Sequence, residues 1–129
     1  MKYAVLLLAL MFAGCGVGST TDGAYETFTI AGETMQVAKE DFPSRMKWDD
    51  AMSACAGLGN GWRLPSRQEQ LVMYQQLQMG GKGNFKEDNY WSSSELNEVD
   101  AWCFDFANGQ ASVNSTYFPR RVRAIRALP

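Results

Sequence analysis

The sequence predicts an α+β fold in which two helices pack on short antiparallel strands. Two stretches near the middle of the chain, residues 48–58 and 66–79, place apolar residues at the three- and four-residue spacing of a helix. Short segments on either side alternate apolar and polar residues and are separated by turn-forming residues, as strands are. Because the helices and the strands come in separate runs, we expect α+β rather than alternating α/β architecture.

The N-terminus resembles a bacterial lipoprotein signal peptide over residues 1–14. Lys2 precedes an apolar run that is too short to span a bilayer, and the Phe-Ala-Gly-Cys segment ending at Cys15 resembles a lipobox with phenylalanine in place of leucine. The resemblance implies that Cys15 carries acyl chains such as palmitate and anchors the chain in the cell envelope, at an outer membrane or the cell surface. An ordinary secretory peptide or a membrane-embedded stub is the alternative.

A tether and one domain are expected after the leader. Residues 15–24 are mostly small, polar and glycine-rich, so they favour a flexible tether. Residues 25–129 are close to the usual size of one domain. This domain opens with alternating apolar residues on both sides of residues 31–33, which predict a hairpin: Phe28, Ile30, Met35 and Val37.

Both helices carry start and stop signals. Asp49 and Asp50 fall in the first turn of the first helix, where carboxylates suit the positive end of the helix dipole, and glycines end it. The second helix starts at Ser66, which forms a capping box with Glu69. Four strands are expected afterwards, at residues 90–94, 101–106, 110–114 and 121–127. Asn108 and the following glycine give the clearest hairpin signal among them.

Several ordered motifs carry a family resemblance. Gly-Trp-Arg-Leu-Pro-Ser at 61–66 and Tyr-Trp-Ser-Ser-Ser-Glu at 90–95 flank the second helix, and an Ala-Trp strand and Arg-Val-Arg-Ala-Ile-Arg at 121–126 follow. Over residues 28–128 the chain resembles the bacterial Lcl C-terminal-type domain, a branch of the C-type-lectin and formylglycine-generating-enzyme superfold. The resemblance implies a C-type-lectin-like fold on an exported protein with a binding or adhesion role, and it names no ligand.

Two cysteines remain once Cys15 is used for lipid. Export to an oxidising compartment predicts a disulfide between Cys55 and Cys103, which would stabilise the fold by about 4 kcal/mol. Two buried thiols or a metal pair are the alternatives. Relatives often carry a cysteine where this chain has Ala124, so the resemblance makes Cys103 the substituted partner of Cys55.

Composition argues against most catalysis. The chain has no histidine, which removes Ser-His-Asp and Cys-His constellations and the commonest zinc ligand. Glu95, Glu98 and Asp100 lie in one loop without a spacing that defines catalytic carboxylates, and the loop oxygens define no calcium site. We therefore expect no enzyme, no cofactor and no metal. Without Lys2, the chain keeps 11 of its 12 cationic residues against 14 anionic ones. This slightly negative net charge disfavours a nucleic-acid partner.

Aromatic and basic side chains are the first candidate ligand contacts. Trp62 and Trp91 could stack on a sugar, although core packing is the favoured reading of both. Arg121 and Arg123 are expected on one strand face, where they could hold an anionic glycan. The alternative is that they pair with acidic residues of the chain, for example Asp105.

Loop residues complete the predicted binding surface. Glu95, Asn97 and Asp100 lie in one of two polar loops, residues 82–89 and 95–100, and loops on a rigid scaffold concentrate binding residues. The sequence thus predicts a cell-envelope lipoprotein with a non-enzymatic lectin-like binding or adhesion module for a glycan or an envelope protein. The alternative is a structural or assembly component of the envelope or of surface fibres, without a small ligand.

Overall fold

The computed structural model describes residues 24–129. The predicted signal peptide, the Cys15 anchor and the tether up to residue 23 lie outside the described residues. None of the helices in the described part is long and apolar enough to cross a membrane. The elements follow the predicted order: β1 (Glu26–Ile30), β2 (Glu33–Val37), α2 (Trp48–Gly57), α3 (Arg67–Gln76), a short 3-10 helix η2 (Gln78–Gly80), β3 (Asn89–Glu95), β4 (Asp100–Asp105), β5 (Gln110–Ser115) and β6 (Ile125–Ala127).

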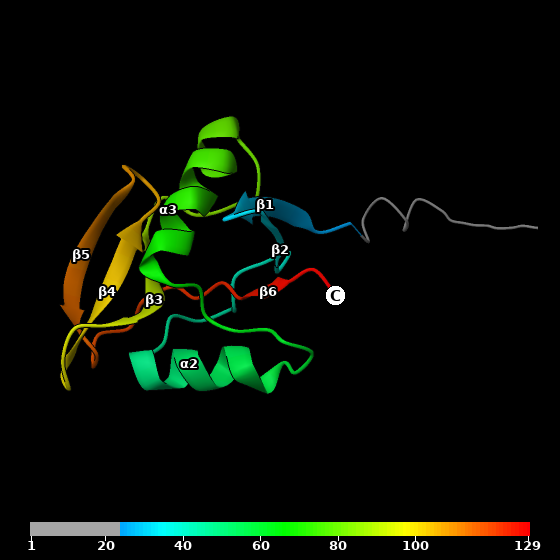
Figure 1. The fold of residues 1–129 in the computed structure, drawn as a ribbon. Helices are drawn as coiled ribbons and strands as arrows, with labels where there is room; N and C mark the ends of the chain where they lie inside the picture. Colours follow the sequence, from blue (N-terminus) through cyan, green and yellow to red (C-terminus); the bar gives the residue numbers. More distant parts are fainter. Residues whose placement is uncertain (1–23) are drawn as a thin grey trace, which may run out of the picture.

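The strands form two small antiparallel sheets. One has the order β1-β2-β6 and the other the order β3-β4-β5. Helix α3 contacts β1, β3 and β4 and so joins the two sheets, whereas α2 packs against β3 on another side of the molecule (Figure 1). Figure 1 also shows β5 at the outer edge, on the side opposite to the point where the described chain begins.

The start of α3 is fixed by the predicted capping box. The Ser66 hydroxyl accepts a hydrogen bond from the Glu69 N–H (3.1 Å), and the Glu69 carboxylate accepts one from the Ser66 N–H (2.8 Å). Arg63 donates two further bonds to Glu69, at 2.8 and 2.7 Å. Burial opposes ionisation of Glu69, but the bonds from Arg63 and Ser66 outweigh it and lower the pKa.

Two apolar clusters make up the core. One lies between α3 and both sheets and is rich in aromatic rings, with Phe85 stacked on Phe106 at 4.5 Å. The other lies under α2, and its members come from helices, strands and the chain before β6: Trp48, Ala51, Cys55, Leu64, Trp91, Ala101, Cys103, Val122 and Ala124. The apolar spacing predicts the buried face of α2 at Trp48, Ala51 and Cys55, but Met52 and Leu58 are exposed. In α3 the contact face includes Met73, whereas Leu71 is exposed.

The β4–β5 hairpin forms where Asn108 and Gly109 predict it. The Asn108 Oδ1 accepts a hydrogen bond from the Gln110 N–H (3.0 Å), and Gly109 has a φ of 78°. A Cβ at Gly109 would lie 2.5 Å from the Tyr74 ring of α3. Glycine is thus required here both by the backbone and by the close approach of α3.

The predicted closing strand over residues 121–127 is wrong in extent. Only Ile125–Ala127 is strand, whereas residues 121–124 cross from one sheet to the other. Arg121 bridges to Tyr90 at the second sheet, and Ile125 pairs with Val37 in the first. Alternation of the side chains cannot distinguish an extended crossover from a strand, because both have extended backbone.

Candidate functional site

Arg123 is a buried structural residue. Its side chain is 2% exposed, and its Nε donates to the Asp41 carboxylate at 2.7 Å. The remaining guanidinium nitrogens donate to three main-chain carbonyls from two loops: Ala38 O (3.1 Å), Gly83 O (2.8 Å) and Asn84 O (3.0 Å). The guanidinium also lies 4.4 Å from the Phe85 ring centroid. The buried fork thus directs four of its five N–H groups to the protein itself, as the alternative prediction of pairing with an acidic residue describes.

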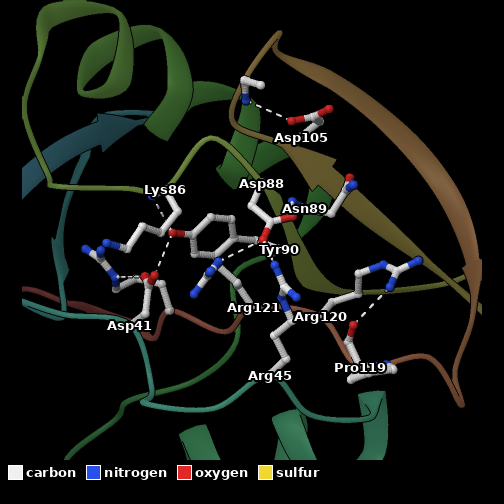
Figure 2. Close-up of polar contacts among 12 residues, drawn as sticks. Asp41, Arg45, Lys86, Asp88, Asn89, Tyr90, Asp105, Pro119, Arg120 and Arg121 are labelled. Atoms are coloured by element: carbon white, nitrogen blue, oxygen red, sulfur yellow. Dashed lines mark hydrogen bonds and ion pairs between the residues drawn. The ribbon is translucent and has the colours of Figure 1, made fainter.

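Tyr90 extends the same network. Its hydroxyl donates to the second Asp41 oxygen and accepts from the Lys86 N–H, each at 2.8 Å, as Figure 2 shows. Burial, together with the neighbouring Asp41 carboxylate, raises the pKa of Tyr90 above its ordinary value. The hydroxyl is therefore a neutral bridge between three chain segments and has no activated proton to offer.

Arg121 forms a shared ion pair at the surface. Its Nε lies 2.9 Å from Asp88, and Arg45 contacts the same carboxylate oxygen (Figure 2). Burial works against ionisation of Asp88, but Arg45, the Asn89 N–H and Arg121 outweigh it and lower its pKa. Arg121 thus pairs with an acidic residue, as the alternative predicted, but its partner is Asp88. Asp105, the suggested partner, instead accepts a hydrogen bond from the Ala107 N–H in its own turn.

A pocket of about 220 Å³ is lined by both arginines. Its walls carry charges of both signs, and its lining is Glu40, Asp41, Phe42, Pro43, Asn84, Lys86, Arg121 and Arg123. Arg121 and Arg123 do meet here, as expected of neighbours on one side of the chain. Their carboxylate partners neutralise the row that was predicted to hold an anionic glycan.

Of the two tryptophans, Trp91 lies in the core and Trp62 lies partly at the surface. Trp91 is fully buried, pairs in register with Cys103 and donates from Nε1 to the Met46 carbonyl at 2.8 Å. It is unavailable to a ligand, as the core interpretation expects. Trp62 is half-buried, and its ring is covered by the Arg126 guanidinium at 4.5 Å. Arg126 thus occupies a face that sugar stacking would need.

Asn97 and Asp100 shape the β3–β4 turn. The Asn97 Oδ1 accepts hydrogen bonds from the N–H groups of Val99 and Asp100, both at 2.9 Å, and its amide donates to the Asp100 carboxylate at 3.2 Å. Glu95 is exposed at the end of β3, in register with Ala101. Asn97 and Asp100 thus set the shape of the turn, in which Glu98 and Val99 are exposed.

A second pocket joins this predicted loop to two segments that the sequence did not single out for binding. A pocket of about 400 Å³ is lined by residues from the start of α2, the β3–β4 turn and the chain after β5: Lys47, Asp49, Asp50, Glu98, Val99, Thr116 and Tyr117. We call these seven residues the loop-end surface. The Tyr117 side chain is 70% exposed, and Lys47 lies 5.2 Å from its ring centroid. Adjacent aromatics in a turn-rich segment, Tyr117 and Phe118, were the available signal.

Main-chain hydrogen bonds hold the three segments of this surface together. The Thr116 N–H donates to the Val99 carbonyl at 2.9 Å, and the Thr116 carbonyl accepts from the Trp48 N–H at 3.0 Å. Thr116 therefore ties both the turn and α2 to one place. The exposed side chains project from a fixed backbone, which is the arrangement expected of a binding surface.

The predicted disulfide is not formed in the structure. Cys55 and Cys103 are free, buried thiols in the cluster under α2. Burial raises the pKa of each to about 12, and Arg120 partly offsets this at Cys103. The alternative interpretation as small core residues describes their setting, since buried neutral thiols pack as apolar groups. Within residues 24–129, no group of three or more cysteine or acidic side chains could hold a metal ion.

Comparison with known protein families matches residues 21–126 to the Lcl C-terminal domain. The chain belongs to the Lcl C-terminal domain family. Among the curated proteins, none matches this family member. Among solved structures, a chain of the complex between botrocetin and the mutant (I546V) von Willebrand factor A1 domain is similar, with 14% identity and a TM-score of 0.54.

A structure of botrocetin itself is also similar, with 13% identity and a TM-score of 0.50. Each of the two alignments covers 79% of this Lcl C-terminal domain chain and 96% of the other chain. At such low identity the similarity concerns the fold alone. The predicted α+β, C-type-lectin-like fold is confirmed.

Proposed function

We propose that this chain is a cell-envelope lipoprotein whose lectin-like domain binds its ligand, without catalysis, through the loop-end surface. The observation that carries the proposal is the convergence of exposed aromatic, apolar and charged side chains from three segments held together at Thr116. Tyr117 and Val99 offer contact area, and Asp49, Asp50 and Glu98 offer hydrogen-bond acceptors.

The family and the fold support binding in general. Botrocetin, on the same fold, forms a complex with the von Willebrand factor A1 domain. An envelope protein is the favoured ligand class here, because the exposed Val99 and Tyr117 suit an apolar partner surface better than a sugar's many hydroxyls. A glycan remains the second class to test, since Tyr117 could also stack on a pyranose ring.

A binding panel tests this proposal. The purified full chain is assayed against envelope proteins and glycans, with Tyr117→Ala and a matched control, Met79→Ala, whose side chain is similarly exposed (68% against 70%). We expect at least about a tenfold loss of affinity for Tyr117→Ala and none for Met79→Ala. Binding that is unchanged in Tyr117→Ala, or no binding by any member of the panel, contradicts the proposal.

Anchoring is tested separately at Cys15. We expect Cys15→Ala to abolish incorporation of labelled palmitate and to release the protein from the membrane fraction. Palmitate labelling that persists in Cys15→Ala would show that the predicted acylation site is wrong. This result would leave the ligand-binding proposal untouched, since the two rest on different residues.

A further inference from the structure

We infer that the outer edge of β5, with the groove beside it, binds an extended peptide segment of a partner protein. β5 pairs with β4 on one side, and no other strand in the described part of the chain pairs with it. In an antiparallel pair, alternate residues direct their N–H and C=O groups away from the partner strand. The free edge of β5 therefore presents a row of hydrogen-bonding groups to solvent.

This edge lacks the usual protection against strand addition. Proteins commonly cover or twist such edges, or place charged residues or proline on them. β5 reads Gln-Ala-Ser-Val-Asn-Ser, without charge or proline, and its residues 110–113 are exposed. One edge strand of the other sheet, β1, carries Glu26. β5 is also regular over all six residues paired with β4, so no bulge turns it away.

A groove runs beside the free edge. Its volume is about 290 Å³, and it lies between α3 and the β4–β5 hairpin, lined by Arg67, Gln68, Leu71, Phe104, Gly109 and Ala111. Ala111 and Val113 share the sheet face of Phe104 and Trp102, because these residues pair in register. Every second side chain of an added strand would point to the same face, toward Leu71 of α3.

The charge of the groove indicates one property of the peptide. Arg67 is the groove's single charged lining residue, and no carboxylate pairs with it among the described ion pairs. Its guanidinium lies 4.1 Å from the Trp102 ring centroid, at the first residue of α3. The positive end of the helix dipole adds to this charge. The fitting peptide therefore alternates apolar residues and carries a carboxylate near Arg67.

The position of β5 suits contact with another molecule. It lies at the outer edge of the domain, on the side opposite to the point where the described chain begins (Figure 1). The groove shares no residue with the loop-end surface. Failure of either site in a binding experiment would leave the other intact.

A random octapeptide phage library, selected against the full chain, tests the inference. We expect enriched peptides to alternate apolar residues and to contain Asp or Glu at one end. A synthetic copy should bind at least about tenfold more weakly to Val113→Lys, because a charged side chain then occupies the strand edge. Thr27→Lys, the same kind of change at an exposed position of the edge strand β1, should bind like the wild type.

Further variants separate specific loss from unfolding. Far-UV circular dichroism checks the fold of each variant, and if Val113→Lys is unfolded, Leu71→Ser tests the exposed α3 wall of the groove instead. Arg67→Gln should weaken binding of the peptide, and so should replacing the peptide's acidic residue with Gln. If the two groups pair, combining both changes should cost no more affinity than either change alone. Peptides that bind Val113→Lys as well as wild type, or a β5-mediated dimer of this chain that excludes them, overturn the inference.

Discussion

Replacing Arg123 with glutamine should destabilise the domain far more than the same replacement of Arg121. The two arginines are two positions apart and line the same pocket, yet their side chains are 2% and 27% exposed. Arg123 satisfies the Asp41 carboxylate and three carbonyls, whereas the Arg121 guanidinium makes one ion pair, to Asp88. The pair of variants therefore compares a buried with a surface arginine in one region.

The expected magnitudes differ severalfold. Removing one partner of a buried ion pair costs about 3–5 kcal/mol, because the remaining charge is left uncompensated. A partly exposed pair such as Arg121–Asp88 contributes about 1 kcal/mol or less. With a urea dependence of about 1–3 kcal/mol/M for a small domain, Arg123→Gln should lower the unfolding midpoint by about 2 M. Arg121→Gln should lower it by about 0.5 M or less.

Urea titrations of the full chain, followed by tryptophan fluorescence and circular dichroism, measure both midpoints. Arg123→Lys serves as a second comparison: it keeps the positive charge, but a single ammonium group cannot reach four acceptors in two loops. Its loss should lie between those of the two glutamine variants. Equal midpoints for Arg123→Gln and Arg121→Gln would refute the assignment of Arg123 as the residue that holds the loops around residues 38–41 and 83–84 together.

Three other predictions follow from the packing. Gly109→Ala should cost about 1–3 kcal/mol of unfolding free energy, because it drives a Cβ into an aromatic ring of α3. Gly59→Ala, with a similar positive φ but open space, should cost less in the same titration. Cys55 and Cys103 should resist iodoacetamide in the folded chain and both react in urea without reductant; an oxidised pair would stay unlabelled. The pKa of Glu69 in the folded chain is below its ordinary 4.5. The ionised carboxylate therefore contributes to the unfolding free energy above pH 4.5, and this contribution is lost as the pH falls through the folded-state pKa. Glu69→Gln should flatten the fall of the unfolding free energy in this acidic range.

The sequence was most informative where local chemistry decides the backbone. The α3 capping box needs only Ser66 and Glu69 at the right spacing, and the β4–β5 hairpin needs only Asn108 and Gly109 to accept their turn. Both were predicted correctly, because their causes lie within a few residues. The extent of β6 was not, because residues 121–124 are extended by contacts with both sheets, which are distant in sequence.

Side-chain roles at the site were harder to predict for the same reason. Alternation placed Arg121 and Arg123 on one side, but it could not show that Asp41 and Asp88 come to meet them from loops 82 and 33 positions away. Likewise, no local pattern distinguishes two cysteines that face one core cluster from two that are bonded. Partners far apart in the chain determine whether a charged residue is available to a ligand.

Residues that carry the family's motifs therefore cannot be assumed to bind the ligand. Trp91 and Arg123 stand in those motifs and are buried, where packing fixes their identity. The exposed Tyr117 and the uncharged β5 lie outside them. Because the core must be kept whatever the ligand, while loops and a free sheet edge can change without unfolding the domain, binding specificity is expected at those surfaces. A Trp91 substitution that reduced binding at unchanged stability would contradict this division.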